Sequence, residues 1–432
     1  MVFLKPFKAT VLNPKREDRA ELICPVYDTI DASRYDKYSA EKNNVIQCTT
    51  RRAGVKEQDF VAHAKKSVVR FFNDGILKEC TKPAFYIYGI RYSISDEIRE
   101  QIPKEEQRDT YFMFGLIALL KLEKLNDQHI LGHEKTFDSS MRERYQLMKE
   151  CGMNFSPIVA EYNMPDHAIN DILEQYLGFH RPDLQLNANR KPIVDVMLDG
   201  YRHLLWEVSD NEVMAKIQQL MRGKSVMILD GHHRYTASYQ LSKDCGTADT
   251  LMMLVEGGDR ALLLLPWHRC VKECRMPELW ANIEANFVVE RCDRCDVYTK
   301  LNEHTNDFDV RLCMYDGKQF YLLRADEQRI RELSEVRGER VGLDVISLHE
   351  WLIDPTLIGK PEESIVFTAS PKDAIEKVDT GDYRVAFFLK PLRIADVEYK
   401  AQVERKGFPQ KSTLFLPKVA EGVVLRRFER EQ

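Results

Sequence analysis

One stretch decides the fold: Lys224-Ser225-Val226-Met227-Ile228-Leu229-Asp230-Gly231-His232-His233-Arg234-Tyr235. Its four consecutive apolar residues, 226–229, are typical of a short buried strand. The polar residues 230–235 predict a loop, and Thr236–Lys243 contains no helix breaker and predicts a helix. The chain is therefore expected to pass from a buried strand through a polar loop into a helix.

A strand–loop–helix connection of this kind can bind an anion, because unpaired N–H groups and the positive end of the helix dipole face the loop. Gly231 lets the backbone approach a ligand or adopt a positive φ. His232, His233 and Arg234 add donors for phosphate oxygens, and Asp230 at the strand end could hold Mg²⁺. The alternative is a histidine-rich turn capped by Asp230, but packing alone does not explain two adjacent histidines beside an arginine.

Strand-like and helix-like segments alternate on both sides of this stretch, which favours an α/β or α+β fold class. Core packing explains nearly all of their apolar stripes. Strands are predicted over Ala84–Ile94 and Tyr111–Glu123, and helices over Asp59–Asp74, Asp166–Leu177, Glu212–Arg222, Pro277–Phe287 and Asp344–Ile353.

The length and composition exclude several classes of protein. A chain of 432 residues predicts two or three domains or one elaborated domain. Its formal net charge of −5 argues against a protein that binds nucleic-acid backbone. No apolar stretch reaches the roughly 20 residues of a membrane span, and Met1–Pro6 does not resemble a signal peptide. Ten scattered cysteines fit a cytoplasmic protein with reduced thiols.

Two cysteine pairs have spacings compatible with zinc: Cys270 with Cys274, and Cys292 with Cys295. Four thiolates could hold a structural zinc ion if the two segments met in space. The preferred interpretation is packing, because these cysteines lie at the ends of a predicted strand and a predicted helix. The sequence alone leaves the zinc alternative open.

A second polar motif, Gly132-His133-Glu134-Lys135-Thr136, follows the strand predicted over 111–123 after a short loop. Glu134 could act as a general base, because a desolvated carboxylate can accept a proton from an alcohol. A solvated loop glutamate is the alternative when this motif is taken alone. Three smaller polar motifs are Asn154–Ile158, Pro266–Arg269 and Pro409–Lys418.

Together, these motifs resemble the family catalogued as domain of unknown function 1015. The resemblance runs over nearly the whole chain, and the motifs occur in the order that the family shows. Gly132 and Val26 replace prolines of the family pattern, and Leu414 and Leu416 replace aromatic residues. The matching elements are Cys24–Asp28, Asn44–Ile46, Gly132–Thr136, Asn154–Ile158, His203–Trp206, Asp230–Tyr235, Pro266–Arg269, Lys411–Thr413 and Pro417–Lys418.

The resemblance implies a ParB/sulfiredoxin-like nucleotide-binding core. Shorter relatives are free-serine kinases, which transfer a phosphoryl group from ADP or ATP to the hydroxyl of L-serine. By this resemblance Glu134 is the base, and Asp230, His232 and His233 complete the catalytic set, with Mg²⁺ placed by Asp230. The implied phosphate-binding residues are Gly231, His232, His233 and Arg234, and the implied substrate-binding residues are His133, Thr136, His268 and Lys411.

The expected architecture is an N-terminal α/β region over 1–105, a catalytic core over 106–275 with an insertion at about 166–223, and a C-terminal α/β region over 276–432 that packs on the core. The expected partners are nucleotide and L-serine, without nucleic acid or membrane, and the oligomeric state is not readable. One alternative is a nucleotide-binding regulatory protein, and another is a kinase for a different small hydroxyl compound. Sulfiredoxin-like redox chemistry is disfavoured because the loop contains no cysteine.

Overall fold

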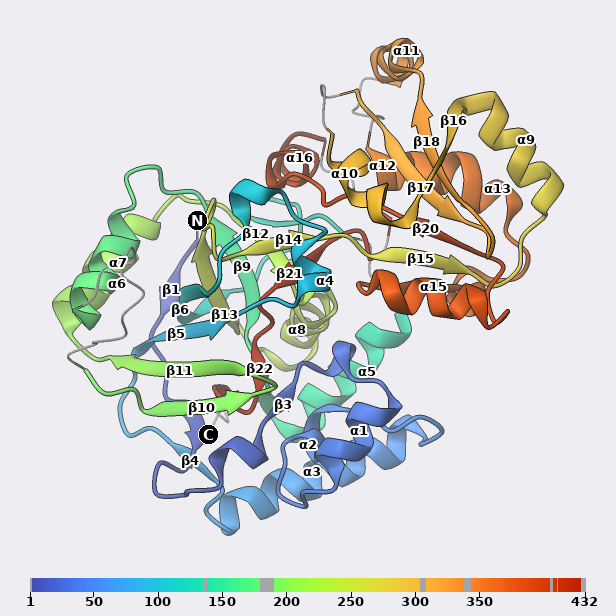
Figure 1. The fold of residues 1–432 in the computed structure, drawn as a ribbon. Coiled ribbons are helices and arrows are strands. Elements are labelled where there is room, and N and C mark those ends of the chain that lie inside the picture. The colour runs from blue at the N-terminus through green and yellow to red at the C-terminus, as the bar shows by residue number, and fades with distance from the viewer. Residues whose placement is uncertain are drawn as a thin grey trace.

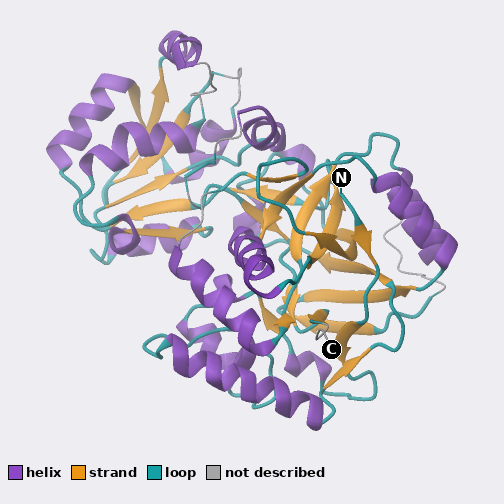
Figure 2. Cartoon of the chain, turned by 180° about the vertical axis from the view of Figure 1, so that it is seen from behind, coloured by secondary structure: helices purple, strands orange, loops and turns teal. Residues whose placement is uncertain are grey.

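The computed structural model describes residues 2–134, 138–178, 190–303, 308–337, 343–404, 407–409 and 411–428. Two lobes are visible in Figures 1 and 2. The larger lobe holds the first 265 or so residues together with the last strands of the chain, and the smaller lobe holds the segment between them. The structure is mixed α/β, which confirms the predicted fold class.

Nine strands form the central sheet of the larger lobe, eight of them in the order β10–β11–β5–β6–β13–β9–β12–β7, with β1 paired to β6. β13 is parallel to β9, and β12 is parallel to β7. The strands are β1 (Leu4–Lys5), β5 (Phe85–Tyr92), β6 (Tyr111–Lys121), β7 (Ile130–Gly132), β9 (Ile158–Tyr162), β10 (Val194–Leu198), β11 (Tyr201–Val208), β12 (Val226–Asp230) and β13 (Asp249–Glu256).

Both faces of this sheet are covered, so its central strands are apolar throughout rather than alternating. Ten of the eleven residues of β6 are buried. Phe114 of β6 packs with helices α6 (Ala168–Leu177) and α7 (Asn211–Met221) on one face, while Met113 joins the larger core on the other face. That face carries α3 (Glu57–Asn73), α5 (Asp138–Cys151) and α8 (His232–Cys245).

The smaller lobe is built on a six-stranded antiparallel sheet in the order β16–β18–β17–β20–β15–β19. Its strands are β15 (His268–Val271), β16 (Phe287–Cys292), β17 (Arg311–Tyr315), β18 (Phe320–Ala325), β19 (Ile365–Thr368) and β20 (Val385–Phe388). Its helices are α9 (Met276–Asn286), α10 (Val297–Asn302), α11 (Glu327–Arg337), α12 (Asp344–Ser347), α13 (Asp354–Thr356), α14 (Pro361–Ser364), α15 (Pro371–Asp379) and α16 (Ile394–Tyr399), with π-helices at Leu348–Ile353 and Lys400–Glu404.

The end of the chain returns to the larger lobe and pairs with early strands there. β21 (Leu414–Leu416) pairs with β14 (Leu263–Leu265), β22 (Ala420–Glu421) with β3 (Cys24–Pro25), and β23 (Leu425–Arg427) with β2 (Ala9–Leu12) and β8 (Met153–Asn154). β4 (Leu77–Glu79) completes that last sheet. The remaining helices are α1 (Ala32–Ser39), α2 (Ile46–Thr49) and α4 (Asp96–Arg99), with 3₁₀ turns at Arg19–Leu22, Tyr27–Thr29, Lys104–Glu106 and Arg294–Asp296.

The predicted helices and strands are present within a few residues of their expected ends. One boundary was wrong: the loop predicted over 230–235 is only a turn, and α8 already begins at His232. Among the described residues no helix combines the length and apolar character needed to cross a bilayer. The expected N-terminal region shares the central sheet with the expected core, because β5 pairs with β6.

Candidate active site

The turn between β12 and α8 forms the centre of the site. Gly231 has φ +97°, which turns the chain directly from the strand into the helix. An added Cβ at this position would lie 2.9 Å from Nε of Arg234. No side chain caps the first turn of α8, so the N–H groups that begin this 14-residue helix remain available to an anion.

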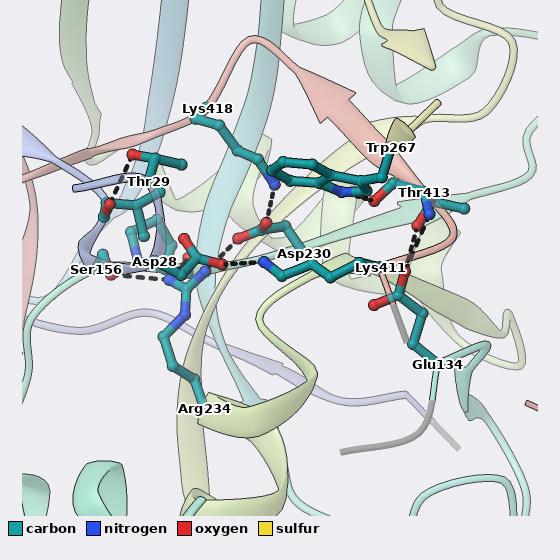
Figure 3. Close-up of polar contacts among 12 residues, drawn as sticks. Asp28, Thr29, Glu134, Ser156, Asp230, Arg234, Trp267, Lys411, Thr413 and Lys418 are labelled. Atoms are coloured by element: carbon teal, nitrogen blue, oxygen red, sulfur yellow. Dashed lines mark hydrogen bonds and ion pairs between the residues drawn. The ribbon is translucent and has the colours of Figure 1, made fainter. Parts of the chain in front are cut away.

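Asp230 lies between two cations, as Figure 3 shows. Its Oδ1 accepts a hydrogen bond from Nζ of Lys418, and its Oδ2 accepts one from Arg234. Burial works to raise the pKa of the Asp230 carboxyl, but the charges of Lys418 and Arg234 outweigh it and hold that pKa well below its usual range. The carboxylate therefore stays ionised and fixes both cations beside the turn.

Arg234 points back beneath the turn rather than out of it. Its Nη1 donates to Oγ of Ser156 at 2.8 Å and to the carbonyl of Pro157 at 2.7 Å. Ser156 donates in turn to Glu421, a buried carboxyl whose pKa is raised by burial. Arg234 was predicted to hold phosphate, but these bonds use its guanidinium to brace β12, α8 and the chain that leads into β9.

Glu134 is held by the turn 411–413 that precedes β21. Its Oε1 accepts the backbone N–H of Ser412 at 3.2 Å, the backbone N–H of Thr413 at 3.1 Å and the hydroxyl of Thr413 at 2.9 Å. No described residue donates to Oε2. The carboxylate is therefore fixed through Oε1 (Figure 3).

His133 and His232 support this arrangement as neutral side chains. Nε2 of His133 lies 2.8 Å from the Thr413 hydroxyl, and Nε2 of His232 accepts the backbone N–H of His133 at 3.2 Å. Burial lowers the pKa of both imidazoles, that of His232 well below its usual value. Both were predicted to contact substrate or phosphate, but the structure buries them behind Glu134 and the α8 turn.

The open side of the site is lined by Lys411, Asp28, His233 and Trp267. Nζ of Lys411 lies 3.7 Å from the Asp28 carboxylate and 4.9 Å from the centre of the Trp267 ring. Both ionic side chains are about one third exposed, at 31% and 33%. His233 feels the charges of Lys411, Asp28 and Glu134, and its pKa is lowered, chiefly by burial and then by Lys411.

One predicted substrate-binding residue, His268, does not join this group. His268 is fully buried in β15, where its Nε2 lies 3.0 Å from the Tyr298 hydroxyl and its ring packs on Phe388. Side chains alternate along a strand, so His268 points away from the site while its neighbour Arg269 points towards it. Thr136 lies outside the described residues.

A large cleft of about 2250 Å³ lies elsewhere, between α4, α10 and α16. Its lining includes Tyr298, Asp344 and Lys390 but neither Glu134 nor Asp230. We place the candidate active site at the α8 turn despite the size of this cleft, because the convergent charges and the oriented carboxylate are at the turn.

Asp230 was also predicted to hold Mg²⁺. Both of its oxygens already bond to cations, so a metal ion would have to displace Lys418. Among the described residues no group of three or more His, Cys, Asp or Glu side chains could hold a metal ion. That finding includes Cys270, Cys274, Cys292 and Cys295, which do not gather into a zinc site. The described part of the chain thus contains no metal site of this kind.

Among the residues of this site that were absent from the predicted set are Lys418, Asp28 and Thr413. All three lie within motifs that the sequence already showed, Pro417–Lys418, Cys24–Asp28 and Lys411–Thr413. A signal for their motifs was therefore present. Their roles depend on which strands of the larger lobe the chain end pairs with, and the sequence did not reveal that pairing.

Three comparisons place the chain among known proteins. A family described as "Protein of unknown function (DUF1015)" matches residues 4–346. A search of curated proteins found no match. Free serine kinase in complex with AMP is similar at 11% identity, over 68% of this chain and 89% of that protein, with a TM-score of 0.35. SbnI with a C-terminal truncation from Staphylococcus aureus is similar at 12% identity, over 71% and 85%, also with a TM-score of 0.35.

The family match spans most of the chain and includes Glu134, the α8 turn and Arg269. Residues 347–432, which include Lys411 and Lys418, lie beyond the match. The resemblance seen in the sequence motifs is confirmed: the chain belongs to the DUF1015 family.

Proposed function

We propose that this protein is a small-molecule kinase that transfers a phosphoryl group from ATP or ADP to the hydroxyl of free L-serine, giving O-phospho-L-serine. One observation carries the proposal. A carboxylate fixed by three donors, that of Glu134, lies beside an uncapped helix N-terminus and the cations Lys411 and Lys418. A base next to an anion site is the arrangement that phosphoryl transfer to an alcohol requires.

Glu134 takes the proton of the substrate hydroxyl on Oε2. Three hydrogen bonds to Oε1 keep the carboxylate from rotating, so Oε2 is presented in one orientation. The hydroxyl oxygen then attacks the terminal phosphorus, and the bond from that phosphorus to the bridging oxygen of the nucleotide breaks. The nucleotide leaves with one phosphate fewer.

The phosphates are met by fixed positive charge. In this proposal the first N–H groups of α8 and the ammonium group of Lys418 meet the phosphates, and His233, whose pKa is lowered by burial, adds a hydrogen-bonding group. Mg²⁺ enters in this proposal with the nucleotide as part of the substrate, where it neutralises phosphate charge. The L-serine specificity rests on the sequence resemblance to free-serine kinases.

The test is a product assay on Glu134→Gln. Purified protein, Mg²⁺ and L-serine are mixed with ATP or with ADP, and O-phosphoserine is followed by phosphorus NMR. We expect the rate of the variant to be about 10²–10⁴-fold lower than that of the wild type, which is the usual contribution of a general base. Its nucleotide affinity should be retained. Glu284→Gln, an exposed change on α9, is the matched control and should keep full activity.

The outcomes separate the remaining possibilities. Phosphoserine made equally fast by Glu134→Gln would refute the assignment of the base. Nucleotide that is bound but never consumed, with serine or with other small alcohols, would favour a regulatory nucleotide-binding protein. Consumption only with another alcohol would keep the kinase and change its substrate.

A further inference from the structure

The Pro266–Arg269 motif contains a buried charge that the proposed mechanism does not use. Arg269 is fully buried, with 0% of its surface exposed. No carboxylate among the described residues forms an ion pair with it. Burial lowers the pKa of its guanidinium to about 9, so the side chain remains charged at neutral pH. A buried cation is costly, and here the charge of Glu134 partly offsets that cost.

The donors of Arg269 join the smaller lobe to the turn that holds Glu134. Nη2 donates to the carbonyl of Lys411 at 3.1 Å, and Nη1 donates to the carbonyl of Trp267. Nε lies 3.4 Å from Nε2 of His349, and the guanidinium lies over the ring of Phe367 at 5.4 Å. Three of these contacts come from the smaller lobe or the strand leading to it, and one crosses to the turn.

The turn needs such support, because Lys411 has φ +54°, a left-handed conformation that is unfavourable for a residue with a side chain. Arg269 binds the carbonyl of Lys411, and Nε1 of Trp267 donates to the carbonyl of Thr413 at 3.1 Å. The opposite side of the same turn donates its two N–H groups to Glu134. The turn is therefore held between the 267–269 segment and the carboxylate.

We infer that Arg269 is a positioning residue, which fixes the 411–413 turn and through it the orientation of the Glu134 carboxylate. The expected effect on catalysis rests on the proposed function. The fixing of the 411–413 turn by Arg269 does not. The smaller lobe thereby contributes to the active site through one buried side chain, without contacting the substrate.

The kinetic test compares Arg269→Gln, Arg269→Lys and His268→Gln. Arg269→Gln should lower kcat about 10- to 100-fold, the cost of misplacing a catalytic group, with the dissociation constant for ATP unchanged. Arg269→Lys keeps the charge and one donor, so it should recover part of the loss. His268→Gln is the matched control, since it alters the same buried strand on its other face and should keep kcat. Equal losses in all three variants, or a loss only of ATP affinity, would overturn the inference.

A second measurement does not depend on catalysis. Hydrogen exchange of the amides of Ser412 and Thr413, which donate to Glu134, should speed up in Arg269→Gln and stay slow in His268→Gln. Unchanged exchange would refute the positioning role even if kcat fell. Faster exchange in a protein that phosphorylates no alcohol would refute the proposed function and leave the positioning role supported.

Discussion

The adjacent histidines His232 and His233 differ in what they can do, although they stand side by side at the start of α8. Successive helical positions are about 100° apart, so one side chain is buried while the other faces the site. His232 is 5% exposed and accepts a backbone N–H through Nε2, whereas His233 faces Lys411, Asp28 and Glu134. Of the two, His233 is therefore the one placed to contact a phosphate.

At the scale of a single residue, we predict the effect of replacing Lys418. Its ammonium is one of the two cations on buried Asp230, and it lies beside the anion-binding turn. We expect Lys418→Met to lower the affinity for ATP at least tenfold. The lost charged hydrogen bond should also cost about 1.5–3 kcal/mol in the free energy of unfolding. Calorimetric titration and thermal denaturation measure the two effects.

The control for Lys418 is Lys65, whose exposed ion pair with Glu150 spans 3.0 Å. Exposed pairs of this kind contribute about 0–1 kcal/mol, so Lys65→Met should change neither quantity appreciably. ATP binding at wild-type strength in Lys418→Met would contradict the phosphate role.

The sequence could predict the chemistry of single residues but only some of their positions. Glu134 was predicted in a motif that follows a strand, and in the structure it comes after β7 and accepts the backbone N–H groups of Ser412 and Thr413. Lys418 was visible in its Pro-Lys motif, yet nothing local connects it with Asp230, which lies 188 positions earlier. His268 was misjudged for the opposite reason: its motif reaches the site through Trp267 and Arg269, whose side chains have different directions.

At the scale of the element, the turn between β12 and α8 depends on Gly231. The positive φ of this residue lets α8 begin immediately after β12. An alanine there would meet Arg234, which is fixed by bonds to Asp230 and Ser156 and cannot move without breaking them. We expect Gly231→Ala to destabilise the protein and to lower ATP affinity at least tenfold. Thermal denaturation and calorimetric titration with ATP measure both.

Gly223→Ala is a matched control at the element scale. Gly223 has φ +77°, and an added Cβ would meet nothing within 4 Å. It should therefore show only the backbone cost of a left-handed alanine, about 1–2 kcal/mol, with ATP affinity intact. Equal effects of the two substitutions would mean that the close approach of Arg234 to the turn has no functional importance.

Helix ends were less predictable than helix positions. The apolar spacing of residues 57–73 and 211–221 predicted α3 and α7 well, because one face of each helix packs on the core. The start of α8 was missed because the polar composition of residues 232–235 predicts a loop. Burial of His232, Arg234 and Tyr235 by the rest of the structure makes them helical.

At the scale of the whole molecule, local pattern predicted the class of fold but not the pairing of its strands. The central sheet joins β5, before residue 105, to β6 and also takes in β10 and β11 from the segment interpreted as an insertion. The last strands close three further sheets over distances of more than 100 residues. Such contacts depend on the global topology, which periodicity does not encode.

The stability of the whole molecule should also depend on pH through Glu161 of β9. Its side chain is buried, and neither carboxylate oxygen has a hydrogen-bond partner in the described structure. Burial, with a smaller contribution from the negative charge of Glu398, raises the pKa of Glu161 to about 8. The folded protein therefore prefers the protonated carboxyl, while the unfolded chain ionises near pH 4.5.

The direction in which stability changes with pH follows from this difference in the pKa of Glu161 between the folded and the unfolded chain. The contribution of neutral Glu161 is complete below pH 4.5 and is lost as the pH rises to about 8, at about 1.4 kcal/mol for each unit. Glu161→Gln keeps a neutral side chain of the same shape. We therefore expect it to raise the melting temperature at pH 8 by several degrees and to change it little at pH 4.5. Thermal scans across this range, with exposed Glu284→Gln as the control, measure the effect. An equal shift at both ends of the range would mean that the carboxyl does not titrate within the fold, and that another group sets the loss of stability at high pH.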